Sequence, residues 1–535
     1  MAIPQTQSTS GQMIFNWPDE TASNFFIRQY IETGHFFYNE PLNGILQGIA
    51  HPRSTNVVGS NIVPTGFLGM IILYGWIGKL AGMDYILFLT PLLAALTPLF
   101  FYGLIKRIFN EAVGFISAIL MFGLASFWYY ANLSMLSNSV FLFLLFAGMY
   151  FFSKQKRSNY IYSVLSALFL GFALITRPIE FIWVGILVVV PFIFYHRKVS
   201  WKQILLFIIF SLIPLAILFY YNKSIYNEFF TVGYLRMNTD QALIDRLPSE
   251  FQVSGGSTLI SYLKFIFVPF GFHPRVILSN FNKYFIQFLN VYFWLAIVGV
   301  IAWSIRYFII KSDKIKSLAK ERIKLLKTEK AYLISAILAG AWLVFYYGNW
   351  LFVDPLVLKY NTIGSSYARY FCSAHILMLP LIAWVLFQIW KMRSSKILRY
   401  SLVSIILVGV TVYSASLVYL SPKDGLFAQK QVLEQYYAQF RKVSGLIGNG
   451  ALIITDRADK VFFPQNKVVV FNGDYSIFPL LNKIVGKTPV YYFTMLPDKD
   501  IDYINKTKLT DLKMKFSEPQ QIDAQFRLFR LGKTI

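Results

Sequence analysis

The chain has 535 residues, of which 56% are hydrophobic and 14% are charged, with a mean hydropathy of +0.51. Soluble domains carry roughly 25% charged residues, so most of this chain cannot face water. The formal net charge of +24 does not indicate nucleic-acid binding, because the basic residues cluster in short connections between apolar runs. The composition therefore predicts a polytopic α-helical membrane protein and excludes an ordinary soluble domain.

Two adjacent carboxylates, Asp19 and Glu20, stand in the polar region that precedes the first apolar runs. A carboxylate near an apolar interface loses solvation, its pKa rises, and it becomes a better general base near neutral pH. The alternative is a helix N-cap, since Asp19 follows a proline and opens an amphipathic run. The two roles are compatible, because a cap can also fix a catalytic carboxylate. The glycine-rich apolar run 64–82 is interpreted as a helix that lies in the bilayer interface on the outer side of the membrane.

Apolar runs close to the roughly 20 residues that cross a bilayer predict ten spans. They lie near 84–105, 112–130, 138–153, 160–176, 179–195, 203–221, 291–310, 331–350, 370–390 and 398–420. Every second connection is strongly basic, so the positive-inside rule puts all of these connections in the cytoplasm. The chain then divides into an external first segment with interfacial helices (1–83), a transmembrane domain (84–420) and an extracytoplasmic domain (421–535).

Two arginines lie at the predicted outer face, where the positive-inside rule gives no reason for a cation. Arg177 follows the span 160–176, and Arg369 opens a late span beside Tyr367. A guanidinium flanked by interfacial tyrosines suits bidentate binding of a phosphate, although snorkelling to lipid headgroups is the alternative. Lys359 is a weaker phosphate-binding candidate of the same kind.

Three further side chains in external segments are candidates for substrate binding: His273, His51 and Tyr367. A loop histidine is more often structural, so both histidines carry little weight. The sequence has no Walker loop, no GxGxxG after a strand and no Cys/His cluster. It therefore predicts no nucleotide site and no certain cofactor, and it leaves a divalent metal possible.

The tail has a different pattern from the rest of the chain. Strand-like runs at 451–455, 467–472, 489–494 and 526–531 alternate with helical patterns. This alternation predicts a small α/β domain with a mostly parallel sheet. Asp456 and Asp459 follow the first of these strands, where ligands gather in parallel sheets. We favour a solvated loop and helix cap for them.

Several short motifs occur in a characteristic order: Pro18-Asp19-Glu20, a helix ending Ile31-Glu-Thr-Gly34, Thr176-Arg177-Pro178, and Ser366-Tyr-Ala-Arg-Tyr370. Together they resemble the GT-C superfamily, the multi-spanning glycosyltransferases that use polyprenyl-phosphate-linked sugars. Protein O-mannosyltransferases and the lipid A aminoarabinose transferases belong to this superfamily. The likeness covers roughly residues 14–420.

The resemblance implies a role for four of these side chains. Asp19 would be the catalytic base that deprotonates the acceptor, and Glu20 would support it. Arg369 would bind the lipid phosphate, with Arg177 as a second candidate, and neutralise charge that grows as the glycosidic bond breaks. The implied partners are a polyprenyl-phosphate-linked sugar donor, a glycan, lipid or protein acceptor, and the lipids of the cytoplasmic membrane.

Other functions fit parts of the pattern. A transporter or flippase of lipid-linked sugars would place ionisable residues at mid-membrane and show repeated halves. Here these residues lie at span ends, and no repeat is visible. A surface-glycan polymerase or ligase shares the carrier and external arginines, and only the segment around Asp19 argues against it. An adaptor whose tail binds partners is the remaining alternative.

Overall fold

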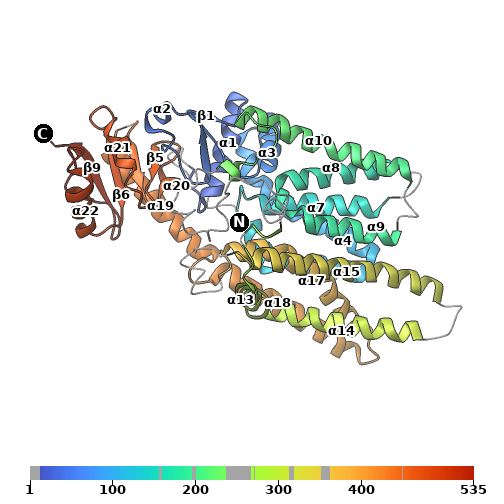
Figure 1. The fold of residues 1–535 in the computed structure, drawn as a ribbon. Helices are drawn as coiled ribbons and strands as arrows, with labels where there is room; N and C mark the ends of the chain where they lie inside the picture. The colour runs from blue at the N-terminus through green and yellow to red at the C-terminus, as the bar shows by residue number, and fades with distance from the viewer. Residues whose placement is uncertain are drawn as a thin grey trace.

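The computed structural model describes residues 13–155, 159–195, 200–236, 267–269, 271–312, 319–350, 362–448 and 450–534. Figure 1 shows a bundle of long helices with the C-terminal domain, in orange and red, at one end. The N-terminal segment, in blue, lies at that same end, between this domain and the bundle. Among the described residues, the C-terminal domain and the N-terminal segment therefore lie at the same end of the bundle.

A helix lies over each of the apolar runs. In chain order these are α4 (Ile86–Ile108), α5 (Glu111–Phe122) with α6 (Ala125–Ala131), α7 (Ser137–Ser153), α8 (Ile161–Thr176), α9 (Phe181–Tyr195), α10 (Trp201–Tyr226), α14 (Asn290–Ser312), α15 (Ala319–Gly348), α17 (Ser366–Trp390) and α18 (Lys396–Leu420). Within the described ranges, six helices are long and apolar enough to span, or eight if each of two bent pairs is one span. The fold class is confirmed, and the count of ten spans stays a prediction.

The two bent pairs mark breaks in the bundle. The axes of α5 and α6 differ by 59°, and the chain turns by 116° between α8 and the segment that begins at Pro178. A residue before proline is driven out of the helical region, and Arg177 accordingly has φ −144° and ψ 79°. The proline therefore ends α8 and sets Arg177 at a sharp turn.

The described flanks of four basic connections are joined in pairs, at helix ends that lie away from the C-terminal domain (Figure 1). The Thr328 hydroxyl of α15 donates to the carbonyl of Ile108 at the end of α4, at 2.8 Å. The side chain of Gln203 at the start of α10 donates to the carbonyl of Asn159 just before α8, at 3.1 Å. One shared basic end is what a single cytoplasmic face requires.

The first segment holds α1 (Pro18–Thr33), α2 (Leu42–Leu46) and α3 (Leu68–Ala81), with a small antiparallel sheet in the order β1-β3-β2. The strands are β1 (Tyr38–Asn39), β2 (Thr55–Val58) and β3 (Asn61–Pro64), and the sequence pattern did not predict them. With 14 residues, α3 is shorter than a span. Its place in the membrane interface stays a prediction.

The C-terminal domain begins with α19 (Leu426–Leu446) and forms a six-stranded sheet in the order β5-β4-β6-β9-β7, with β8 paired to β9. Its strands are β4 (Leu452–Thr455), β5 (Lys467–Val470), β6 (Val490–Thr494), β7 (Met514–Phe516), β8 (Gln520–Gln521) and β9 (Arg527–Lys533), and its shorter helices are α20 (Asp459–Phe462), α21 (Ile477–Asn482) and α22 (Asp498–Ile504). Only β4, β5 and β6 pair in parallel. The prediction of a mostly parallel sheet is thus wrong for the last three strands, whose short connections favour antiparallel pairing.

Both faces of this sheet are covered. Ile453, Val468 and Phe493 on one face belong to the same buried core as the bundle helices. On the other face, Ile454 packs in a second core that includes Leu46 of α2. The first segment and the C-terminal domain are therefore packed together and onto the bundle.

Glycines in α3 allow neighbouring elements to approach closely. A Cβ on Gly69 would lie 2.4 Å from the backbone nitrogen of Thr176, at the end of α8. A Cβ on Gly78 would lie 2.3 Å from the side chain of Ile31 in α1. Through these contacts α3 fixes α1 relative to the turn that carries Arg177.

We expect Gly69→Ala to lower the melting temperature of the purified protein, because backbone atoms of α8 cannot move aside as a flexible side chain would. Overpacking of this kind costs roughly 1–3 kcal/mol. Gly185→Ala in α9 is the matched control, since no atom of another described element lies within 4 Å of its added Cβ. Equal melting temperatures for the two variants in detergent would contradict the close packing of α3.

Candidate active site

The start of α1 gives the two adjacent carboxylates different environments. The helix begins at Pro18 with Trp17 as its N-cap residue, and the backbone N–H of Trp17 donates to Glu20 Oε2 at 3.1 Å. Glu20 is fully buried, whereas the Asp19 side chain is 42% exposed. Trp17 and Glu20 therefore cap the helix in place of Asp19. The Asp19 side chain stays available to other partners.

Asp19 has two polar partners from distant parts of the chain. The Ser54 hydroxyl donates to Oδ1 at 2.6 Å, and Arg369 Nη1 lies 3.4 Å from Oδ2. Charge-assisted hydrogen bonds of nitrogen to a carboxylate are usually about 2.7–2.9 Å long, so the second contact is loose. The acid and one guanidinium that the sequence put on the outer face thus share one site.

Arg369 keeps unused capacity for an anion. It lies in the first turn of α17, and its side chain is only 10% exposed. Nη2 donates to the Tyr370 hydroxyl at 2.9 Å, and the guanidinium lies over the rings of Tyr370 and Trp17. Nε is buried with no hydrogen-bond partner among the residues that the structure describes. A phosphate oxygen would satisfy this donor.

Arg177 is already compensated by its neighbours. Its Nη2 lies 2.6 Å from Glu180 Oε1, and both side chains are buried. It also donates to the Tyr347 hydroxyl at 3.1 Å. Its guanidinium lies 5.2 Å from the ring centre of Tyr370, the same ring that Arg369 contacts at 4.8 Å. Arg177 therefore lies next to the site as half of a buried ion pair, while Arg369 keeps a donor that has no partner among the described residues.

The remaining candidates lie in varied surroundings. Tyr367 is buried and donates its hydroxyl to the carbonyl of Trp350. His273 caps the helix α13 (Pro274–Phe281). Nδ1 of His51 lies 2.9 Å from the carbonyl of Pro52 and 3.1 Å from the Thr55 hydroxyl, in the turn before β2. Lys359 falls outside the described residues. Substrate binding by these side chains stays a prediction.

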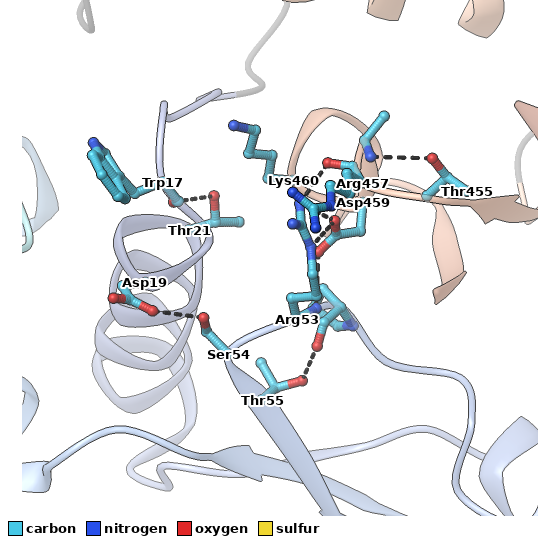
Figure 2. Close-up of polar contacts among 12 residues, drawn as sticks. Trp17, Asp19, Thr21, Arg53, Ser54, Thr55, Thr455, Arg457, Asp459 and Lys460 are labelled. Atoms are coloured by element: carbon cyan, nitrogen blue, oxygen red, sulfur yellow. Dashed lines mark hydrogen bonds and ion pairs between the residues drawn. The ribbon is translucent and has the colours of Figure 1, made fainter. Parts of the chain in front are cut away.

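Sequence reasoning missed residues that the fold brings to this site. Ser54 contacts Asp19 directly, as Figure 2 shows. Tyr234, in the turn of Gly233–Arg236, lies within electrostatic reach of Asp19, Arg369 and Arg177. Its side chain is 48% exposed. A lone serine or tyrosine in a loop carries no sequence signal, so only the folded chain reveals these neighbours.

The two aspartates after β4 are not in a solvated loop. Asp459 is fully buried, and its Oδ1 lies 2.7 Å from Nη2 of Arg53. Asp456 accepts hydrogen bonds from the hydroxyls of Tyr492 at 2.8 Å and Thr494 at 2.6 Å, and burial raises its pKa. The solvated interpretation of Asp459 is wrong, because the first segment packs over this edge of the domain.

The part of the chain that the structure describes contains no group of three or more His, Cys, Asp or Glu side chains able to hold a metal ion. The polar chemistry available around Asp19 in the described residues is that of carboxylate, guanidinium and hydroxyl groups.

Residues 79–232 match the model of the Alg9-like mannosyltransferase family. No curated protein sequence matches the chain at a significant level. Among solved structures, ArnT from Cupriavidus metallidurans bound to undecaprenyl phosphate is 10% identical, with a TM-score of 0.49 over 97% of this chain and 94% of that chain. The oligosaccharyltransferase of Archaeoglobus fulgidus in the apo form is 12% identical, with a TM-score of 0.46 over 91% of this chain and 66% of that chain.

The match to a mannosyltransferase family confirms the resemblance to the GT-C superfamily and supports glycosyltransferase activity in a multi-pass membrane protein. The matched region begins after Asp19 and ends before Arg369, so it assigns no role to either residue. At 10–12% identity and TM-scores of 0.46–0.49, the solved structures assign no residue role either.

We expect Glu180→Ala to destabilise the protein strongly, because it leaves the buried guanidinium of Arg177 without its counter-charge. Breaking a buried pair in this way costs about 3–5 kcal/mol. The control is Glu434→Ala, which removes the exposed partner of Lys430 at 3.8 Å and should change stability little. Melting temperatures in detergent check both, and a small loss for Glu180→Ala would mean that Arg177 is solvated.

Proposed function

We propose that this protein transfers a sugar from a polyprenyl-phosphate donor to an acceptor at the outer face of the cytoplasmic membrane, with Asp19 as general base. The observation that carries the proposal is the 3.4 Å approach of Asp19 to Arg369 across 350 positions of sequence. Asp19 is in the first turn of α1, and α1 lies at the end of the bundle next to the C-terminal domain (Figure 1). A family match to mannosyltransferases supports the reaction class.

The proposed reaction is a single displacement. Asp19 takes the proton of an acceptor hydroxyl, and the acceptor oxygen attacks the anomeric carbon of the donor sugar. The bond between that carbon and the phosphate oxygen breaks, and its electron pair goes to the polyprenyl phosphate. The partial exposure of Asp19 supports this role, because an acceptor must reach the carboxylate.

Arg369 is proposed to bind the phosphate of the donor. Charge on this phosphate grows as the glycosidic bond breaks, so a fixed guanidinium stabilises the transition state more than the ground state. The loose contact with Asp19 and the unpartnered Nε support this role. Arg177 is proposed as a secondary contributor: Glu180 holds its guanidinium against the ring of Tyr370, which Arg369 also contacts.

The bilayer explains why the site is at the end of the helices. The isoprenoid tail of the donor can stay in lipid against exposed apolar side chains of the bundle, such as Leu402 and Ile405 of α18. The sugar and phosphate then reach the polar end. The acceptor, which is a glycan, a lipid or a protein, approaches from the aqueous side.

We expect Asp19→Asn to reduce transfer by about 100- to 10,000-fold, because the amide keeps the shape of the side chain but cannot accept the proton. The assay reconstitutes the protein in vesicles with a panel of polyprenyl-phosphate sugars and follows release of polyprenyl phosphate. An unchanged melting temperature shows that folding survives. Full transfer by this variant would end the case for Asp19 as base.

We expect Arg369→Lys to raise the KM for the donor and lower kcat, each by about tenfold, because an ammonium group cannot form the bidentate contact of a guanidinium. Arg441→Lys is the control, since Arg441 is exposed on α19 and bonds only within its own helix among the described residues. Kinetics that are equally affected in both variants would argue against a phosphate site at Arg369.

A further inference from the structure

The turn that precedes β2 contains a serine in a strained conformation. Ser54 has φ of +60°, in the left-handed region that glycine or asparagine usually occupies. The flanking Thr55 hydroxyl donates to the carbonyl of Pro52 at 2.7 Å and so closes the turn. A residue kept in an unfavourable conformation indicates that its side chain is needed there. In Ser54 the only polar group of the side chain is the hydroxyl, and it points at Asp19 (Figure 2).

The residue before it is clamped by the C-terminal domain. The backbone N–H of Arg53 donates to Asp459 Oδ2 at 2.8 Å, and its Nε donates to Oδ1 at 2.8 Å. Nη2 of Arg53 also lies 2.7 Å from Oδ1 and donates to the carbonyl of Arg457. One buried carboxylate therefore fixes both the backbone and the side chain of Arg53, as Figure 2 shows.

The next residue of α20 contacts the segment that leads into α1. Lys460 donates from Nζ to the carbonyl of Asn16, which directly precedes the N-cap of α1. Its ammonium group lies 4.7 Å from the ring centre of Tyr436. Burial, with the nearby charge of Arg53, lowers the pKa of Lys460 to about 8. Two consecutive side chains of the C-terminal domain thus contact the first segment at two places. Lys460 contacts it before Asp19 in the chain, and Asp459 contacts it after Asp19, next to Ser54.

We infer that the C-terminal domain positions the catalytic carboxylate: Asp459 clamps Arg53, and the adjacent Ser54 directs its hydroxyl onto Oδ1 of Asp19. This inference rests on the proposed role of Asp19. With Oδ1 held, Oδ2 is the oxygen that faces Arg369 and the acceptor. Ser54, Arg53 and Asp459 are positioning residues, because they act through Asp19. The alternative is that the clamp only docks the domain.

The decisive variant is Ser54→Gly, which removes the hydroxyl and also relieves the left-handed strain. We expect the melting temperature to stay equal or rise, while kcat falls about tenfold with little change in the donor KM. Losing a donor to a carboxylate disfavours its ionised form. The acid limb of the rate profile should therefore move to higher pH, with Arg369 still in contact with the carboxylate.

Lys513→Gly is the matched control, since Lys513 has φ of +50° in the C-terminal domain and lies outside this network. It should leave kcat and the pH profile unchanged. Wild-type kcat and an unshifted acid limb in Ser54→Gly would overturn the positioning role.

A double-mutant cycle separates positioning from docking. Asp459→Asn should lower kcat about three- to tenfold in the wild-type background, and should add nothing further in the Ser54→Gly background. A pure docking role predicts a lower melting temperature with kcat unchanged, and this result would overturn the inference.

The activity of Asp19→Asn distinguishes the two proposals. If that variant is inactive and Ser54→Gly is fully active, only the positioning inference fails. If Asp19→Asn keeps full activity, the proposed base fails and the inference falls with it.

Discussion

The geometry of the candidate active site depends on the loose contact between Asp19 and Arg369. The acid comes from α1 and the guanidinium from α17, so neither helix alone determines their separation. Close packing through the glycines of α3 fixes α1 against the bundle. Contacts with α20 fix it from the other side. This polar pair is thus held in place by apolar packing against the bundle and by polar contacts with the C-terminal domain.

The two arginines that contact the ring of Tyr370 differ in how far a carboxylate compensates their charge. Arg177 has a buried carboxylate at 2.6 Å, which balances the cost of burying its charge. Among the described residues, the carboxylate partner of Arg369 is Asp19, which is partly exposed and lies 3.4 Å away. A guanidinium that is desolvated but incompletely paired gains most when an anion arrives. The difference between these two side chains therefore follows from their partners in the fold.

Much of this could be predicted from the sequence, because its signals are local. The lengths of the apolar runs predicted the helices, and the alternation of strand-like and helical runs predicted the strands that contain Leu452 and Val490. The distribution of basic connections predicted that Asp19 and Arg369 lie on one face. The Arg53–Asp459 clamp could not be predicted, since it joins residues 406 positions apart. The strands β1 to β3 are two to four residues long, too short for a periodic pattern to emerge. The antiparallel half of the C-terminal sheet depends on connections that strand patterns alone do not specify.

The shared core of the sheet and the bundle limits how a substrate can enter. Because Ile453 and Phe493 are packed in the same apolar cluster as the helices, the C-terminal domain cannot swing aside like a lid on a flexible tether. Opening it would expose a large apolar surface to water. With the domain in place the Asp19 side chain is still 42% exposed, so a molecule that reaches this carboxylate passes beside the domain and does not displace it.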